Sequence, residues 1–204
     1  MDIAAVLWKH SRPMRNEQLI GFPLLICLLL LMLLRPATSA AAPAGGGEET
    51  TDGQVNLPQG MGWEDWRVVR DQRAYHAMVK VFVRKGETPA TAKVRVMVAR
   101  TPKPTFDSPQ ATLDALKQTA KHQCEKVSAN SLRKSAADLI YELRAFGCAG
   151  QKGERYLLQR IAFIGQWELQ VTYAPMGPTD NLPPSEKQQA LKLLSSVTIA
   201  QTAN

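Results

Sequence analysis

Two stretches of this chain carry apolar side chains at both odd and even positions, and they restrict the choice of fold more than any other feature. They are residues 138–148, DLIYELRAFGC, and residues 156–164, YLLQRIAFI. A strand in a sheet with one face in water alternates apolar and polar residues, and these stretches do not. We therefore expect two central strands covered on both sides, as in a layered fold of sheet and helices.

The neighbouring segments alternate as half-buried strands do. Residues 75–84 and 93–100 predict a hairpin, with 66–74 as an outer strand. Residues 167–173 alternate as well, which leaves Glu168, Gln170 and Thr172 on the polar side. Gly165 stands at the first position of a two-residue turn before this last strand, where a hairpin favours glycine.

Helices are predicted on either side of the central strands. Asp107 or Ser108 before Pro109 is typical of a helix start, and the apolar stripe that follows at helical spacing consists of Leu113, Leu116, Ala120, Cys124 and Val127. Ser185 with Gln188 matches a capping box ahead of a second helix. Its stripe is Ala190, Leu191 and Leu194, and residues 197–199 favour a last short strand.

The order is thus strands, a helix, three antiparallel strands and a helix, which indicates an α+β fold: an antiparallel sheet covered by two helices in a three-layer α/β/α sandwich. Over about residues 63–200 this order resembles the PsbP-like sandwich, a family that includes an extrinsic photosystem II subunit, the Ran-binding Mog proteins and the DcrB-like bacterial lipoproteins. The resemblance implies a docking or assembly module without an active site. No binding residue of that family can be matched to a position in this sequence.

The N-terminus has the pattern of an export signal. Leu19–Leu34 are sixteen residues without a charge, preceded by Arg12 and Arg15 and followed by small residues. We expect residues 1–42 to be a signal peptide that is cleaved after Ala40 or Ala42, with translation starting at Met14. Residues 43–62 then form a flexible leader, and residues 63–204 form one globular domain that is periplasmic or secreted. Contact with a membrane is expected only through an uncleaved signal.

In an exported chain, the remaining cysteines are expected to form a disulfide. Cys27 lies inside the signal, so Cys124 and Cys148 remain, and disulfides persist outside the cytosol. We expect these two to form a structural bridge. They are too far apart in sequence for the C-x-x-C arrangement of a redox pair.

Several motifs for catalysis and for metal or cofactor binding are missing from the sequence. Outside the signal only His76 and His122 remain, which excludes a three-histidine metal site, and there is no nucleophile elbow or phosphate-binding glycine loop. We expect no enzymatic activity, no metal and no cofactor. The alternative kept open is a carboxylate-dependent envelope hydrolase using Glu142 and Glu168 from neighbouring strands.

Basic residues gather in and around the predicted hairpin. They are expected to form a basic outer face that docks an acidic partner: Arg67, Arg70, Arg73, Lys80, Arg84, Lys85, Lys93, Arg95 and Arg100. We therefore expect a non-catalytic periplasmic binding or assembly module. Its partner is a protein or an anionic envelope component rather than nucleic acid, and an immunity or chaperone protein for a secreted toxin is the alternative within this class.

Overall fold

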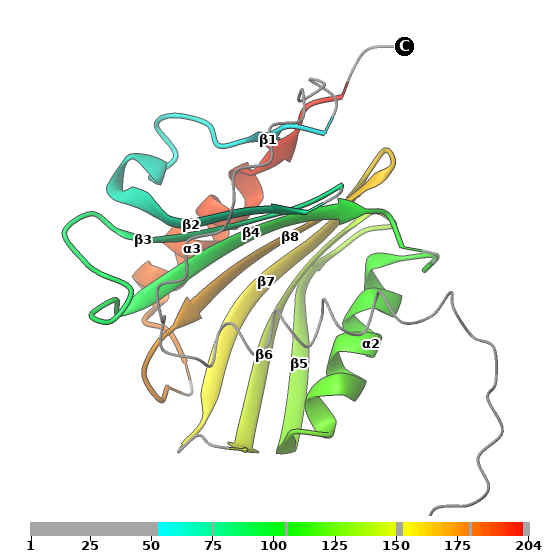
Figure 1. The fold of residues 1–204 in the computed structure, drawn as a ribbon. Helices are drawn as coiled ribbons and strands as arrows, with labels where there is room; N and C mark the ends of the chain where they lie inside the picture. The colour runs from blue at the N-terminus through cyan, green and yellow to red at the C-terminus, as the bar shows by residue number, and fades with distance from the viewer. Residues whose placement is uncertain (1–52, 75, 105, 150–152, 180, 202–204) are drawn as a thin grey trace, which may run out of the picture. The chain divides into compact units, whose positions relative to one another are not determined.

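A seven-stranded antiparallel sheet organises the described part of the chain, which in the computed structural model comprises residues 53–74, 76–104, 106–149, 153–179 and 181–201 (Figure 1). The strands lie in the order β2-β3-β4-β8-β7-β6-β5. Their bounds are β2 Trp66–Ala74, β3 Ala77–Arg84, β4 Val94–Pro102, β5 Cys124–Lys134, β6 Asp138–Cys148, β7 Arg155–Ile164 and β8 Trp167–Pro175. β6 and β7 have a neighbouring strand on each edge, so both are central as predicted.

Two α-helices accompany the sheet in the described residues, α2 (Pro109–Lys121) and α3 (Pro184–Ser196). A short 3-10 helix, η1 (Trp63–Asp65), precedes β2. A second sheet consists of β1 (Val55–Asn56) and β9 (Thr198–Ile199), so part of the expected leader pairs with the end of the domain. An antiparallel sheet with two helices confirms the predicted α+β class. The expected signal peptide, residues 1–42, lies outside the described residues.

Alternation along β8 places the two helices against opposite sides of the sheet. Leu169 belongs to the apolar cluster that contains Leu193 and Leu194 of α3. Its neighbour Glu168 accepts a hydrogen bond from Thr112 of α2 at 3.2 Å. Because successive side chains of a strand point to opposite sides, we name these the α3 side and the α2 side.

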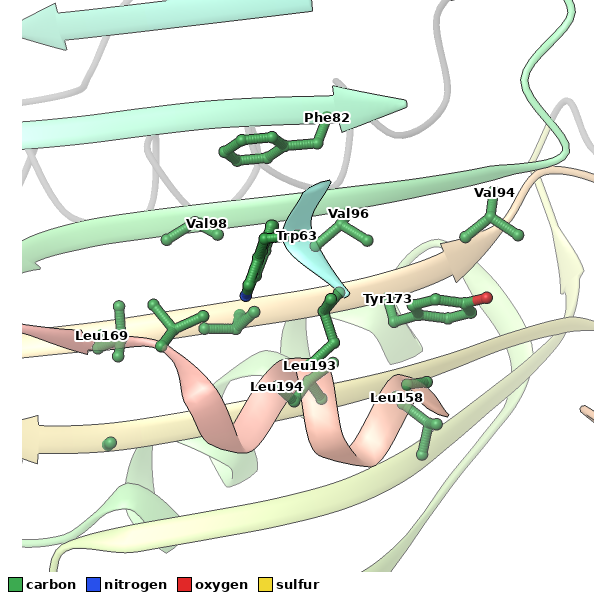
Figure 2. Packing of buried hydrophobic residues seen from close by; sticks show 14 of the residues in the cluster. Trp63, Phe82, Val94, Val96, Val98, Leu158, Leu169, Tyr173, Leu193 and Leu194 are labelled. Atoms are coloured by element: carbon green, nitrogen blue, oxygen red, sulfur yellow. The ribbon is translucent and has the colours of Figure 1, made fainter. Parts of the chain in front are cut away.

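The apolar core lies on the α3 side, where Trp63 of η1 packs between the sheet and α3 (Figure 2). Its indole Nε1 donates to Ser196 Oγ at 2.9 Å, and its ring meets Phe82 edge-on at 5.1 Å between centroids. Val96, Val98, Leu158, Leu169 and Leu194 surround it and are almost inaccessible to solvent. Burying a large apolar side chain contributes about 1.5–3 kcal/mol, so this cluster is a main source of stability.

Arg160 of β7 fixes the C-terminal end of α3. Its Nη1 donates to the carbonyl oxygens of Leu194 at 3.1 Å and Val197 at 2.8 Å, while Nε and Nη2 donate to the carboxylate of Asp138, each at 3.0 Å. A helix ends with carbonyl groups that have no partner within the helix. The buried guanidinium of Arg160 donates to these carbonyl groups, and the carboxylate of Asp138 neutralises its charge.

The helices begin and end differently from the sequence prediction. Ser108 caps α2 as expected, accepting from the backbone N–H of Ala111, but the helix ends at Lys121, and Cys124 and Val127 lie in β5. Pairing with β6 overrides the helical spacing of those two residues, so four strands follow α2 instead of three. α3 begins at Pro184 without a side-chain cap, so the predicted capping box at Ser185 is not formed.

The Cys124–Cys148 disulfide is present, as predicted. The two cysteines are partners in the β5–β6 register, so the bond joins neighbouring strands at one end of the hairpin. The predicted turn at Gly165 is confirmed too, with φ of +58° and Ile164 paired to Trp167.

Reducing the disulfide should lower the melting temperature by several degrees. Closing a loop of about 25 residues restricts the unfolded chain and contributes about 3.5 kcal/mol in the chain-entropy model. Differential scanning calorimetry with and without reductant measures the effect, and the Cys124→Ser/Cys148→Ser variant should not respond to reductant. An unchanged melting curve of the reduced wild-type protein would contradict the estimate.

Candidate functional site

The register of the sheet divides the nine basic residues between its two sides. Lys80 pairs with Val98, so it lies on the α3 side, whereas Arg95 lies on the α2 side. By the same alternation the α3 side also carries Arg73, Arg84 and Arg100, and the α2 side carries Arg67 and Arg70. Lys85 and Lys93 stand in the β3–β4 connection. The hairpin therefore does not present all nine residues on one face.

Several of these residues have partners within the domain. Lys80 and Arg73 both approach the carboxylate of Asp71, at 3.6 and 3.7 Å. Arg100 stacks on Trp167 at 4.4 Å from the ring centroid and donates to the carbonyl oxygen of Gly53 at 2.5 Å. These contacts connect the edge of the sheet and the N-terminal segment to the core.

Arg95 is half-buried and bonded within the domain. Burial lowers the pKa of its guanidinium, and Nη2 donates to the carbonyl oxygen of Pro89 at 2.7 Å. This bond joins β4 to the connection between β3 and β4. We therefore do not place Arg95 in a docking surface.

Arg84 occupies a different environment, at the start of a row of aromatic rings on the α3 side. Its guanidinium carbon lies 5.5 Å from the ring centroid of Trp66, and Trp66 meets Tyr173 edge-on at 6.2 Å. The hydroxyl of Tyr173 donates to Glu186 of α3 at 2.7 Å. Burial, and then the Glu186 carboxylate, raise the pKa of Tyr173, so this tyrosine remains a hydrogen-bond donor at neutral pH.

A second group of the same kind lies on β6 and β7. The hydroxyl of Tyr156 donates to Glu142 at 2.9 Å, and Lys187 of α3 forms an ion pair with the same carboxylate. Arg144 lies 5.9 Å from the ring centroid of Tyr156. Burial tends to raise the pKa of Glu142, but the bonds from Lys187 and Tyr156 outweigh it and lower the pKa, so Glu142 is ionised.

Together these groups form one strip on the α3 side, which we call the aromatic–basic band. Its residues come from β2, β3, β8, β7 and β6 and from the N-terminal turn of α3, and they are Trp66, Arg84, Tyr173, Glu186, Tyr156, Glu142, Lys187 and Arg144. Phe146 follows Arg144 on the same side of β6 and is 47% exposed. Sequence reasoning found only Arg84 as a docking residue, because the others come from strands far apart in the chain.

The α2 side of the sheet contains a buried chain of polar side chains. Tyr141 donates to Gln159, Gln159 to Gln170 at 3.1 Å, and Gln170 to Glu168. Glu168 also accepts from Thr112 of α2 and is only 3% exposed. Burial raises the pKa of Glu168, and the bonds from Gln170 and Thr112 offset only part of this rise. Through the bond from Thr112, this row of hydrogen bonds helps to hold α2 against the sheet.

This arrangement differs from the sequence prediction in two ways. The polar residues of β8, Glu168 and Gln170, are buried rather than solvated. Glu142 and Glu168 lie on opposite sides of the sheet with β7 between their strands, so they are not brought together as a pair of carboxylates for hydrolysis. The hydrolase alternative thus loses the geometry on which it depended.

Within the part of the chain that the structure describes, no three acidic, histidine or cysteine side chains come close enough to hold a metal ion. His76 and His122 both lie at the surface. The described helices also include none with the length and apolar character needed to cross a bilayer.

Replacing Glu168 with glutamine should stabilise the protein increasingly as the pH rises. A carboxyl whose pKa is raised in the folded state contributes most at low pH, and its contribution is lost as the pH rises through the folded pKa. Melting temperatures of Glu168→Gln and the wild type, measured from pH 4 to pH 9, should therefore diverge by a few degrees in favour of the variant at the alkaline end. A constant difference across this range would show that Glu168 does not titrate as its surroundings imply.

Comparison with known proteins gives a structural likeness to solved structures. No protein-family model matches the chain, and neither does any curated protein. Among solved structures, the chain is similar to the solution structure of cyanobacterial PsbP (CyanoP) from Synechocystis sp. PCC 6803. The two share 13% sequence identity with a TM-score of 0.44, over 78% of this chain and 98% of that one. PsbP is the family that the order of elements resembles.

Proposed function

We propose that this chain is a non-catalytic binding or assembly module of the cell envelope, built as a PsbP-like three-layer sandwich, and that it docks an acidic protein through the aromatic–basic band. The observation that carries the proposal is the row of contacts in which Arg84 lies over the ring of Trp66 and Trp66 meets Tyr173 edge-on. Tryptophan, tyrosine and arginine are the residues that most often carry the binding energy of protein interfaces.

The accessibility of the band suits such a contact. Arg84 is exposed, Trp66 and Arg144 are half-buried, and Tyr156 and Tyr173 are buried beneath them. The rings are therefore held in place by the domain before a partner arrives, so binding costs little side-chain entropy. An exposed arginine on a fixed ring presents both an apolar surface and a charge.

Charge favours an acidic partner. The two carboxylates of the band, Glu142 and Glu186, each accept a bond from a tyrosine, and Glu142 also pairs with Lys187. The outer groups are then Arg84 and Arg144, with Lys85 and Lys93 in the adjoining connection. Such a surface steers an acidic partner and strengthens its encounter at low salt.

A photo-crosslinking side chain at Lys85, next to Arg84, should capture one protein in the native cells, whereas the same group at Arg70 on the α2 side should not. The Arg84→Glu variant should reduce the adduct at least tenfold, because it reverses the outer charge of the stack without removing a buried side chain. Mass spectrometry of the adducts measures both effects. The same set of adducts from Lys85 and Arg70 would overturn the proposal.

The envelope location rests on the N-terminal pattern and on the disulfide, whose formation outside the cytosol is favoured. Fractionation followed by N-terminal sequencing should find the protein in the periplasm or the medium, beginning at Ala41 or Pro43. No peptide from residues 1–13 should be detected in cells if translation starts at Met14. An intact chain in the cytosol with both thiols open to alkylation would contradict export.

A further inference from the structure

Phe146 of β6 leaves a large part of its aromatic ring open to solvent. It is 47% exposed, the highest value among the exposed large apolar side chains of the described residues. It stands on the α3 side of the sheet, whereas α3 itself packs on β7 and β8. Covering a side chain of this size contributes about 1.5–3 kcal/mol. The ring is therefore an apolar contact point beyond the end of the helix layer.

Basic side chains lie on two sides of this ring. In the register of the two strands, Phe146 pairs with Lys126 of β5, and Arg144 pairs with Ser128. All four therefore share the α3 side, where Lys126 and Ser128 are exposed and Arg144 is half-buried. Diagonal neighbours on paired strands are within reach of long side chains. Two positive charges are thus held together next to an exposed aromatic ring.

The carboxylates of the β5–β6 hairpin are directed elsewhere. Glu125 stands on the α2 side by alternation along β5. Asp138 accepts hydrogen bonds from Arg160, each at 3.0 Å, and Glu142 accepts one from Tyr156 at 2.9 Å. The positive charge beside the ring is therefore available to carboxylates of a partner.

We propose that Phe146, Lys126 and Arg144 form an anchor site for one segment of the partner, in which a large apolar side chain lies between acidic residues. The apolar side chain covers the Phe146 ring, and the carboxylates meet the two basic side chains. This inference rests on the proposed function, because it names the segment that the acidic partner places at the β6 end of the aromatic–basic band. It also extends the docking surface onto β5.

Photocrosslinking from two serines of β5 tests this site in the native cells. Ser128 is exposed on the α3 side, whereas Ser131, which pairs with Tyr141, is exposed on the α2 side. A crosslinking side chain at Ser128 should capture the same protein as the one at Lys85, and at Ser131 it should not. Mass spectrometry of the crosslinked peptide should find a large apolar residue between acidic residues.

Two lysines of β5 provide a matched pair of variants. Lys126 lies on the α3 side and Lys134, which pairs with Leu139, on the α2 side, and both are exposed. Lys126→Glu should lower the yield of the Ser128 adduct about tenfold or more, and Lys134→Glu should leave it unchanged. Phe146→Ser should lower the yield similarly. The melting temperatures of both lysine variants should stay within about two degrees of the wild type, which separates lost binding from lost folding.

A purely structural role for Phe146, as cover for the neighbouring disulfide, predicts a different result. Phe146→Ser would then lower the melting temperature and leave the adduct unchanged, which would overturn the inference. So would equal loss of the adduct in the two lysine variants, or a crosslinked peptide without acidic residues.

Comparison of the two crosslinking positions separates this inference from the proposed function. An adduct at Lys85 without one at Ser128 would overturn the anchor site and leave docking through the band in place. An adduct at Ser128 without one at Lys85, or different proteins at the two positions, would overturn docking of one partner along the band. The absence of adducts from both positions would overturn both proposals.

Discussion

The structure depends on burying both sides of β7 and β8. These neighbouring strands carry apolar or hydrogen-bonded side chains at almost every position, and such strands are stable only with cover above and below. α3 supplies that cover over a dry cluster around Trp63. α2 reaches the other side through the bond from Thr112 to Glu168. The two sides of one sheet thus differ in chemistry, apolar under α3 and partly polar under α2.

The position of the proposed docking surface follows from where this cover ends. α3 packs on β7 and β8, and the rings and charges beside its N-terminal turn are therefore left partly open. α2 contacts β5, β6 and β7 on the other side of the sheet. The aromatic–basic band thus lies where the cover by α3 ends, so the docking that we propose there does not require the core to rearrange.

Sequence patterns predicted the elements of this fold better than the relation between them. The double apolarity of 138–148 and 156–164, the cap at Ser108 and the glycine turn at Gly165 depend on local chemistry and are confirmed. Alternation shows that a strand has two faces. It does not show which faces of neighbouring strands lie on the same side of the sheet. That is why Lys80 and Arg95 were expected together and lie on opposite sides. The burial of Glu168 could not be predicted either, because its partners Thr112 and Gln170 lie on a helix far away in sequence and on its own strand.

The disulfide holds one end of the β5–β6 hairpin beside the aromatic–basic band. It joins β5 and β6 at the end where Phe146 and Arg144 lie on β6. The outermost strand of a sheet has a partner on only one edge and is the strand most prone to local opening. A covalent bond at the first residue of β5 opposes such opening, so the register of β5 with β6 is retained next to Arg144. Without the bond, this end of the hairpin would rely on hydrogen bonds between the two strands alone. An oxidised Cys124–Cys148 pair therefore keeps the β6 end of the proposed docking surface in a fixed position before a partner binds.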